Sequence, residues 1–66
     1  MDLNEAMLSA KAGMQITEPM LLRESWTVRW VEVEKLFYYF GPNGGKRHKI
    51  VFNDAHRASY QWKVVT

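Results

Sequence analysis

The spacing of apolar residues near the start of the chain predicts an amphipathic helix over Asp2–Gly13. Its apolar stripe consists of residues three or four positions apart, namely Leu3, Met7, Ala10 and Met14. Asp2 can cap the first turn, and Glu5 follows at the capping-box spacing. Gly13 suits the left-handed conformation that ends many helices. We expect this helix to lie across one face of a sheet.

A run of β-branched and aromatic residues, WTVRWVEVEKLFYYF, extends from Trp26 to Phe40 and predicts strands. Its alternation changes phase at Trp30–Val31, and a shift of one residue sends later side chains to the other face of a sheet. This pattern predicts either a bulge at that point or a strand that uses both faces. A turn at Glu34-Lys35 would then lead into a second strand over Leu36–Phe40.

Shorter segments complete the predicted fold. Gly41–Gly45, with the sequence GPNGG, favours a turn that joins Leu36–Phe40 to a strand over Arg47–Phe52. The remaining predicted elements are strands over Met14–Ile16 and Met20–Leu22, a helical turn over Asp54–Ser59, and a last strand over Tyr60–Val65. The order predicts an α+β fold. One N-terminal helix packs on a four- to five-stranded antiparallel sheet, and a short helical turn precedes the last strand.

Length and composition limit the core. The 66 residues form one expected domain, residues 1–66, and contain no Cys for disulfides or thiolate metal sites. A chain this short buries only about 60% of its unfolded surface. Trp26–Phe40 alone holds six aromatic residues, more than one face of a small sheet can cover. We therefore expect some rings to meet a ligand or another copy in a homo-oligomer.

The charge pattern bears on partners and location. Nine Lys and Arg residues against seven Asp and Glu residues give a net charge of +2, too small to predict nucleic-acid binding. The basic cluster at 46–49 is either a solvated hairpin end or a phosphate site. The acidic start of the chain does not resemble a signal peptide, and no apolar run reaches about 18 residues. With no Cys, these features favour a cytoplasmic protein without a membrane partner.

The candidate chemistry favours binding over catalysis. His48 and His56 lack the spacing of metal ligands, and two nitrogens do not complete a zinc site. No nucleophile-elbow glycines flank a serine, so we expect neither an enzyme nor a metal or cofactor. Aromatic planes beside cations and amides are typical of nucleotide sites. The predicted ligand-binding residues are Arg23, Trp26, Trp30, Arg47, Lys49, Asn53, Asp54 and His56. Alternatively, the rings belong to the core or to a subunit interface.

Three segments carry a resemblance to a known family. They are NEAMLSAKAG, LLRESW and FNDAHRASYQWKVV, in this order. Together they resemble the small phage Thoeris anti-defence proteins, which combine an F-x-E-A-L-x-x-x-K-x-G helix, an R-x-x-W element and a terminal D-W-x-V. The matching positions here are Glu5, Ala6, Met7, Lys11, Gly13, Arg23, Trp26, Trp62 and Val64. The chain departs from the pattern by an insertion over Met14–Pro19 and by Ser25, Gln61 and the turn near His56.

The resemblance implies a function that composition alone does not. It implies homotetramers that sequester a cyclic nucleotide or cyclic ADP-ribose-type immune signal between subunits without cleaving it. The location would be the host cytoplasm if a phage encodes the chain. The alternative is a small inhibitor that binds a host protein through an exposed aromatic sheet face.

Overall fold

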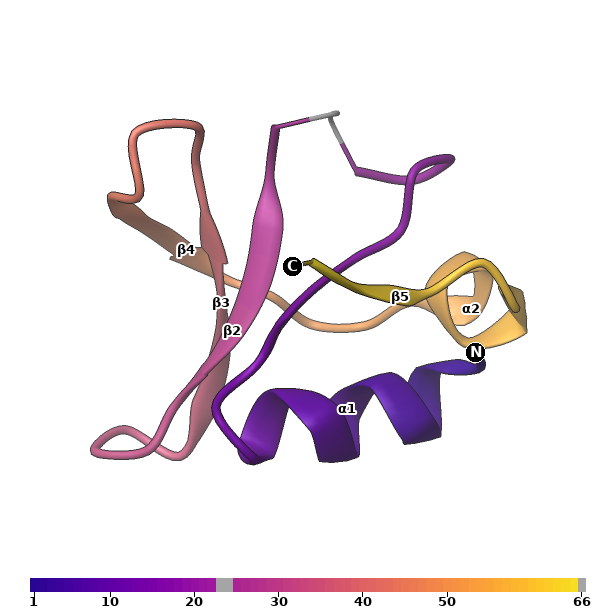
Figure 1. The fold of residues 1–66 in the computed structure, drawn as a ribbon, viewed down its shortest axis with the longest axis horizontal. Coiled ribbons are helices and arrows are strands. Elements are labelled where there is room, and N and C mark those ends of the chain that lie inside the picture. Colours follow the sequence, from indigo (N-terminus) through magenta and orange to yellow (C-terminus); the bar gives the residue numbers. More distant parts are fainter. Residues whose placement is uncertain (23–24, 66) are drawn as a thin grey trace.

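A computed structural model describes residues 1–22 and 25–65, apart from the side chain of Arg47. The elements are α1 (Leu3–Lys11), β1 (Gln15–Thr17), β2 (Thr27–Val31), β3 (Leu36–Phe40), β4 (Lys46–Lys49), α2 (Asp54–Ala58) and β5 (Lys63–Val65). The strands pair antiparallel in the order β4-β3-β2-β1-β5. Helix α1 lies along one side of this sheet, and α2 lies near the N-terminus (Figure 1). The α+β prediction is confirmed.

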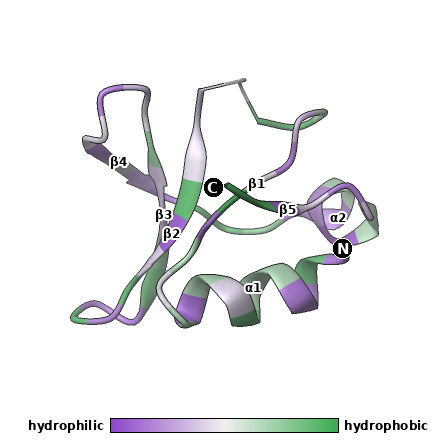
Figure 2. Ribbon diagram, in the orientation of Figure 1, coloured by the Kyte–Doolittle hydropathy of each residue, from purple (hydrophilic) through white to green (hydrophobic). Residues whose placement is uncertain are grey.

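Helix α1 begins and ends at the predicted signals. The Asp2 carboxylate accepts a hydrogen bond of 2.9 Å from the Glu5 backbone N–H. Gly13 adopts φ 102° just after the helix, in the left-handed region that favours glycine. Hydrophobic and hydrophilic residues alternate along α1 (Figure 2). Its buried side chains are Leu3, Ala6 and Ala10. Met14 was predicted on the buried stripe but is 51% exposed, because the helix ends before it.

Each face of the sheet follows from its strand register. On β2, Val28 is fully buried, pairs with Tyr39, and lies on the face that α1 covers. Side chains of a strand alternate between faces, so the neighbouring Thr27 and Arg29 point the other way. We call this opposite side the helix-free face. Register and alternation give it Gln15, Thr17, Thr27, Arg29, Val31, Leu36, Tyr38, Phe40, Lys46, Lys49, Lys63 and Val65.

The change of alternation at Trp30–Val31 is not caused by a β-bulge. β2 and β3 stay paired without interruption from Thr27↔Phe40 to Val31↔Leu36. The turn lies over residues 32–35, where Lys35 adopts φ 57° and donates a 2.8 Å backbone hydrogen bond to the Val31 carbonyl. Apolar residues therefore occupy both faces, which was the second of the two sequence-based alternatives.

Three predicted strands differ from the observed ones. Met20–Leu22 forms a turn instead of an edge strand, and the predicted Met20–Leu22 strand is wrong. The backbone N–H of Leu22 donates to the Glu18 carbonyl at 2.9 Å, and the Met20 N–H donates to the Glu18 carboxylate at 2.7 Å. Those local bonds satisfy donors that a strand would direct to a neighbour. β4 and β5 are also shorter than predicted, and β4 contains a register shift opposite Tyr38/Phe40.

The aromatic residues are spread over both faces of one copy. All nine Trp, Tyr and Phe residues lie in the described part of the chain. Trp62 is 1% exposed, Phe37 is 8% exposed, and only Tyr60, at 78%, is fully in solvent. The other rings are half-buried. The rings do not share one face, and six of the nine are only half-buried in a single copy.

Candidate functional site

Two cation–ring pairs lie side by side on the helix-free face. The Arg29 guanidinium carbon lies 4.6 Å from the centre of the Phe40 ring. The Lys46 ammonium lies 4.7 Å from the centre of the Tyr38 ring. Arg29 and Tyr38 are also cross-strand partners, so the two pairs are neighbours. Positive charge and aromatic surface therefore occur together at the centre of this face.

The carboxylate of Glu34 forms hydrogen bonds with the Lys46–Tyr38 pair but not with the Arg29–Phe40 pair. Glu34 accepts hydrogen bonds of 2.7 Å from the Lys46 ammonium and 2.7 Å from the Tyr38 hydroxyl. These bonds, that from Lys46 first, lower the pKa of Glu34 below its usual value. Within residues 1–22 and 25–65, no carboxylate pairs with Arg29, and its Nε is buried without a hydrogen-bond partner. Arg29 is thus a partly exposed cation without a carboxylate partner among the described residues.

A hollow of about 860 Å³ is lined by Thr27, which precedes Arg29 by two residues on β2. Hydroxyl groups and one ammonium line it together with apolar side chains, and its walls include Thr17, Ser25, Trp26, Thr27, Lys63 and Val65. The Thr17 hydroxyl donates a 2.9 Å hydrogen bond to the Trp26 carbonyl, which ties two of these walls together. Volumes of about 300–1,000 Å³ are typical of small-molecule sites.

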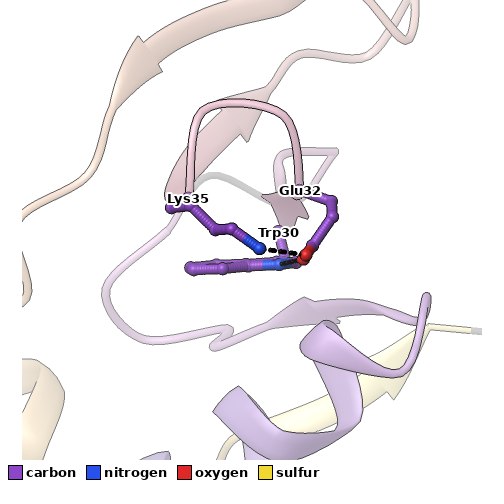
Figure 3. A network of polar contacts seen from close by, with 3 residues as sticks. All are labelled: Trp30, Glu32 and Lys35. Carbon is purple, nitrogen blue, oxygen red and sulfur yellow. Dashed lines mark hydrogen bonds and ion pairs between the residues drawn. The ribbon is translucent and has the colours of Figure 1, made fainter.

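Trp30, a predicted ligand-binding residue, lies on the opposite face of the sheet. Its ring packs against Phe37 with centroids 4.8 Å apart, and the Lys11 ammonium of α1 lies 4.9 Å above it. Its indole N–H donates to the Glu32 carboxylate, which also accepts from Lys35 (Figure 3). The Trp30 side chain is therefore already hydrogen-bonded within the β2–β3 hairpin and in contact with Lys11 of α1.

The polar turn at α2 forms a third location. The Asn53 side chain accepts from the His56 backbone N–H at 2.8 Å, and His56 Nδ1 accepts from the Asn53 backbone N–H at 3.1 Å. This reciprocal pair is a capping box. Burial lowers the pKa of His56, and the nearby negative charge of Glu18 opposes that shift. Asn53 and His56 therefore cap the N-terminus of α2, and the side chain of Asp54 next to them is exposed.

The predicted site residues are thus distributed over three places within one copy. Trp26 lines the hollow, and Lys49 lies on the helix-free face across from Tyr38. Trp30 lies under α1, and Asn53, Asp54 and His56 lie at α2. Arg23 and the side chain of Arg47 lie outside the described residues, as does the contact expected between Arg23 and Trp26.

Sequence reasoning missed Arg29, Thr17, Thr27 and Lys63. Simple alternation from the buried Val28 would have placed Thr27 and Arg29 together on one face. The link to Lys63 needs the pairing of β1 with β5, whose partners are distant in sequence. Among the described residues, no three His, Cys, Asp or Glu side chains come together as a metal site. Neither described helix has the length and apolar character to cross a membrane.

No protein-family model, curated protein or solved structure matches this chain. The resemblance to the phage Thoeris anti-defence proteins therefore stays a prediction from its short motifs. The function has to be argued from the helix-free face itself.

Proposed function

We propose that this protein binds a small phosphorylated signalling nucleotide on its helix-free face and holds it without cleaving it. The observation that carries the proposal is the hollow of about 860 Å³ lined by Thr27 and Lys63, together with Arg29, a cation two residues from Thr27 that no described carboxylate neutralises. Hydroxyl groups in the hollow suit a sugar or base, and the cations beside it suit phosphate. In keeping with the family resemblance, the ligand class is a cyclic nucleotide or cyclic ADP-ribose-type immune signal.

A second copy of the chain completes the pocket in this proposal. The hollow opens to solvent along one sheet face, while tight small-molecule sites cover about 70–90% of their ligand. A homo-oligomer, a dimer or a tetramer, would close the ligand between two such faces. The proposed setting is the host cytoplasm, where sequestration would lower the concentration of the free signal.

Thermal stability with and without ligand tests the proposal. The purified protein is heated with cyclic dinucleotides and with cyclic ADP-ribose isomers, one at a time. A ligand at 100 times its dissociation constant adds about 2.7 kcal/mol to the free energy of unfolding. For a domain of this size the melting temperature then rises by roughly 10–20 °C. The bound compound is then released by heat, and its mass is measured by mass spectrometry. Sequestration predicts that the released nucleotide has the same mass as the one added.

A pair of charge variants locates the binding. Lys63→Gln removes the cation that lines the hollow, and we expect it to weaken binding roughly three- to tenfold. Lys35→Gln removes a cation on the hairpin, away from the hollow, and should leave binding unchanged. No thermal shift with any nucleotide contradicts the proposal, and a cleaved product shows that the protein is an enzyme.

The same face also supports a second function, inhibition of a host protein. Half-buried Tyr38 and Phe40 together with Arg29 offer the aromatic residues and the arginine that are enriched in protein interfaces. Stable co-purification of one host protein, together with the absence of nucleotide binding, would favour this alternative.

A further inference from the structure

We infer that Arg29 is the residue that recognises the phosphate of the ligand, while the neighbouring hollow takes the uncharged part. This inference rests on the proposed function and assigns the orientation of the ligand in that site. It also names the residue on which discrimination between phosphorylated and unphosphorylated ligands depends.

The position of Arg29 is fixed before any ligand arrives. It lies in the middle of β2, which has β3 on one side and β1 on the other. Its guanidinium stacks 4.6 Å from the centre of the Phe40 ring. A planar guanidinium that is already stacked loses less conformational freedom when it binds an oxyanion.

The donors of Arg29 are also unused. Lys35 is bonded to Glu32, and Lys46 is bonded to Glu34 at 2.7 Å. Throughout the part of the chain that the structure describes, Arg29 has no such partner. Only its Nε is both buried and unbonded, so the two terminal nitrogens remain open to a ligand. A guanidinium fork of this kind binds two oxygens of a phosphate or carboxylate at once.

The distance from Arg29 to the hollow fits one nucleotide. Thr27 lines the hollow and precedes Arg29 by two residues on the same face. Two strand residues span about 6.6 Å. A ligand that contacts both places needs an uncharged polar part and an oxyanion about that far apart, as in a nucleotide. Lys49 pairs with Tyr38, the cross-strand partner of Arg29, and Lys63 pairs with Thr17, one strand beyond Thr27. These two further cations on the helix-free face favour the higher charge of phosphate over a single carboxylate.

Binding measurements on three variants test the inference with the cyclic nucleotide that gives the largest thermal shift. Arg29→Gln removes the charge, and Arg29→Lys keeps the charge but removes the fork. We expect Arg29→Gln to weaken binding about 10- to 100-fold and Arg29→Lys by an intermediate factor. The control is Arg57→Gln on α2, an exposed residue away from the helix-free face. It should bind like the wild type, and circular dichroism checks that every variant is folded.

A second measurement does not depend on the nucleotide. Inorganic pyrophosphate and citrate are titrated separately while the Arg29 Nε–H signal is followed by NMR, assigned through its loss in Arg29→Lys. We expect pyrophosphate to shift this signal at lower concentration than citrate. An Arg29 signal that neither anion moves overturns the inference, and so does an equal response to both, since the site would then not select phosphate.

The two measurements separate the inference from the proposed function. Undiminished nucleotide binding by both Arg29 variants overturns the inference and leaves the proposed function standing. A pyrophosphate response at Arg29 without binding of any nucleotide supports the inference and overturns the proposed function.

Discussion

Replacement of Trp62 by Phe tests how the last strand is held to the core. Trp62 is 1% exposed, and its indole N–H donates a 2.9 Å hydrogen bond to the His56 carbonyl of α2. Its ring also contacts the rings of Phe52, with centroids 5.9 Å apart, and His56, at 6.0 Å. This one side chain therefore joins α2 and β5 to the core that lies under α1.

The expected loss of stability follows from two terms. Trp62→Phe leaves a buried carbonyl without its donor, which costs about 1–3 kcal/mol. The smaller ring also leaves a cavity, which adds about 1 kcal/mol. A domain of this length has a total stability of roughly 3–10 kcal/mol. We therefore expect the melting temperature to fall by roughly 10–25 °C.

Urea unfolding followed by circular dichroism measures this change without relying on the fluorescence of the missing indole. The control is Tyr60→Phe, two residues earlier, at a side chain that is 78% exposed. It should change the free energy of unfolding by less than about 0.5 kcal/mol. If Trp62→Phe also stays within 0.5 kcal/mol of the wild type, roughly the size of a surface change, the bond and the packing described here do not hold the C-terminal segment.

Two further predictions concern a glycine and a buried histidine. Gly13→Ala should destabilise the protein by about 1 kcal/mol, because Gly13 has φ 102°, a left-handed conformation that alanine adopts only with strain. Gly45→Ala is the control, because both sites have space for a Cβ but Gly45 does not need a left-handed backbone. Equal melting temperatures of the two variants would count against this reasoning. Because burial holds the pKa of His56 below its usual 6.5, the unfolded chain takes up the proton first, so stability should fall as pH drops below 6.5 and on through the folded pKa. His56→Gln keeps a capping-box residue and should flatten the pH dependence of urea unfolding below pH 6.5. An unchanged slope would rule out His56 as its cause.

Local signals predicted the local structure well. Asp2 and Gly13 mark the ends of α1, and the Gly41–Gly45 turn joins β3 to β4. Each of these depends on residues within about four positions of one another. Their outcome therefore needed no knowledge of the rest of the fold.

Features that depend on distant residues were predicted less well. At Met20–Leu22, the apolar pattern favoured a strand, but the backbone N–H groups of Met20 and Leu22 donate hydrogen bonds to Glu18 and so form a turn. The choice of face in Trp26–Phe40 depended on where β2 ends, and the sequence left two alternatives there. Arg29, the residue proposed to bind phosphate, stands in no basic cluster along the chain, and its place beside Phe40 and Tyr38 follows only from the strand pairing.

The aromatic residues also bear on the expected homo-oligomer. A single copy divides its rings between the α1 side and the helix-free face, and half-buried Tyr38 and Phe40 lie on the face that no helix covers. The case for a homo-oligomer now rests on the open hollow and on the proposal that a second copy closes it.

Amide chemical-shift mapping tests the central claim most directly. The labelled protein is titrated with the cyclic nucleotide that raises its melting temperature most, and the shift of every backbone signal is recorded. Binding at the helix-free face predicts that the largest changes occur at Thr17, Thr27, Arg29 and Lys63. Changes confined to α2 or to the outer side of α1, or no change at all, would contradict the account.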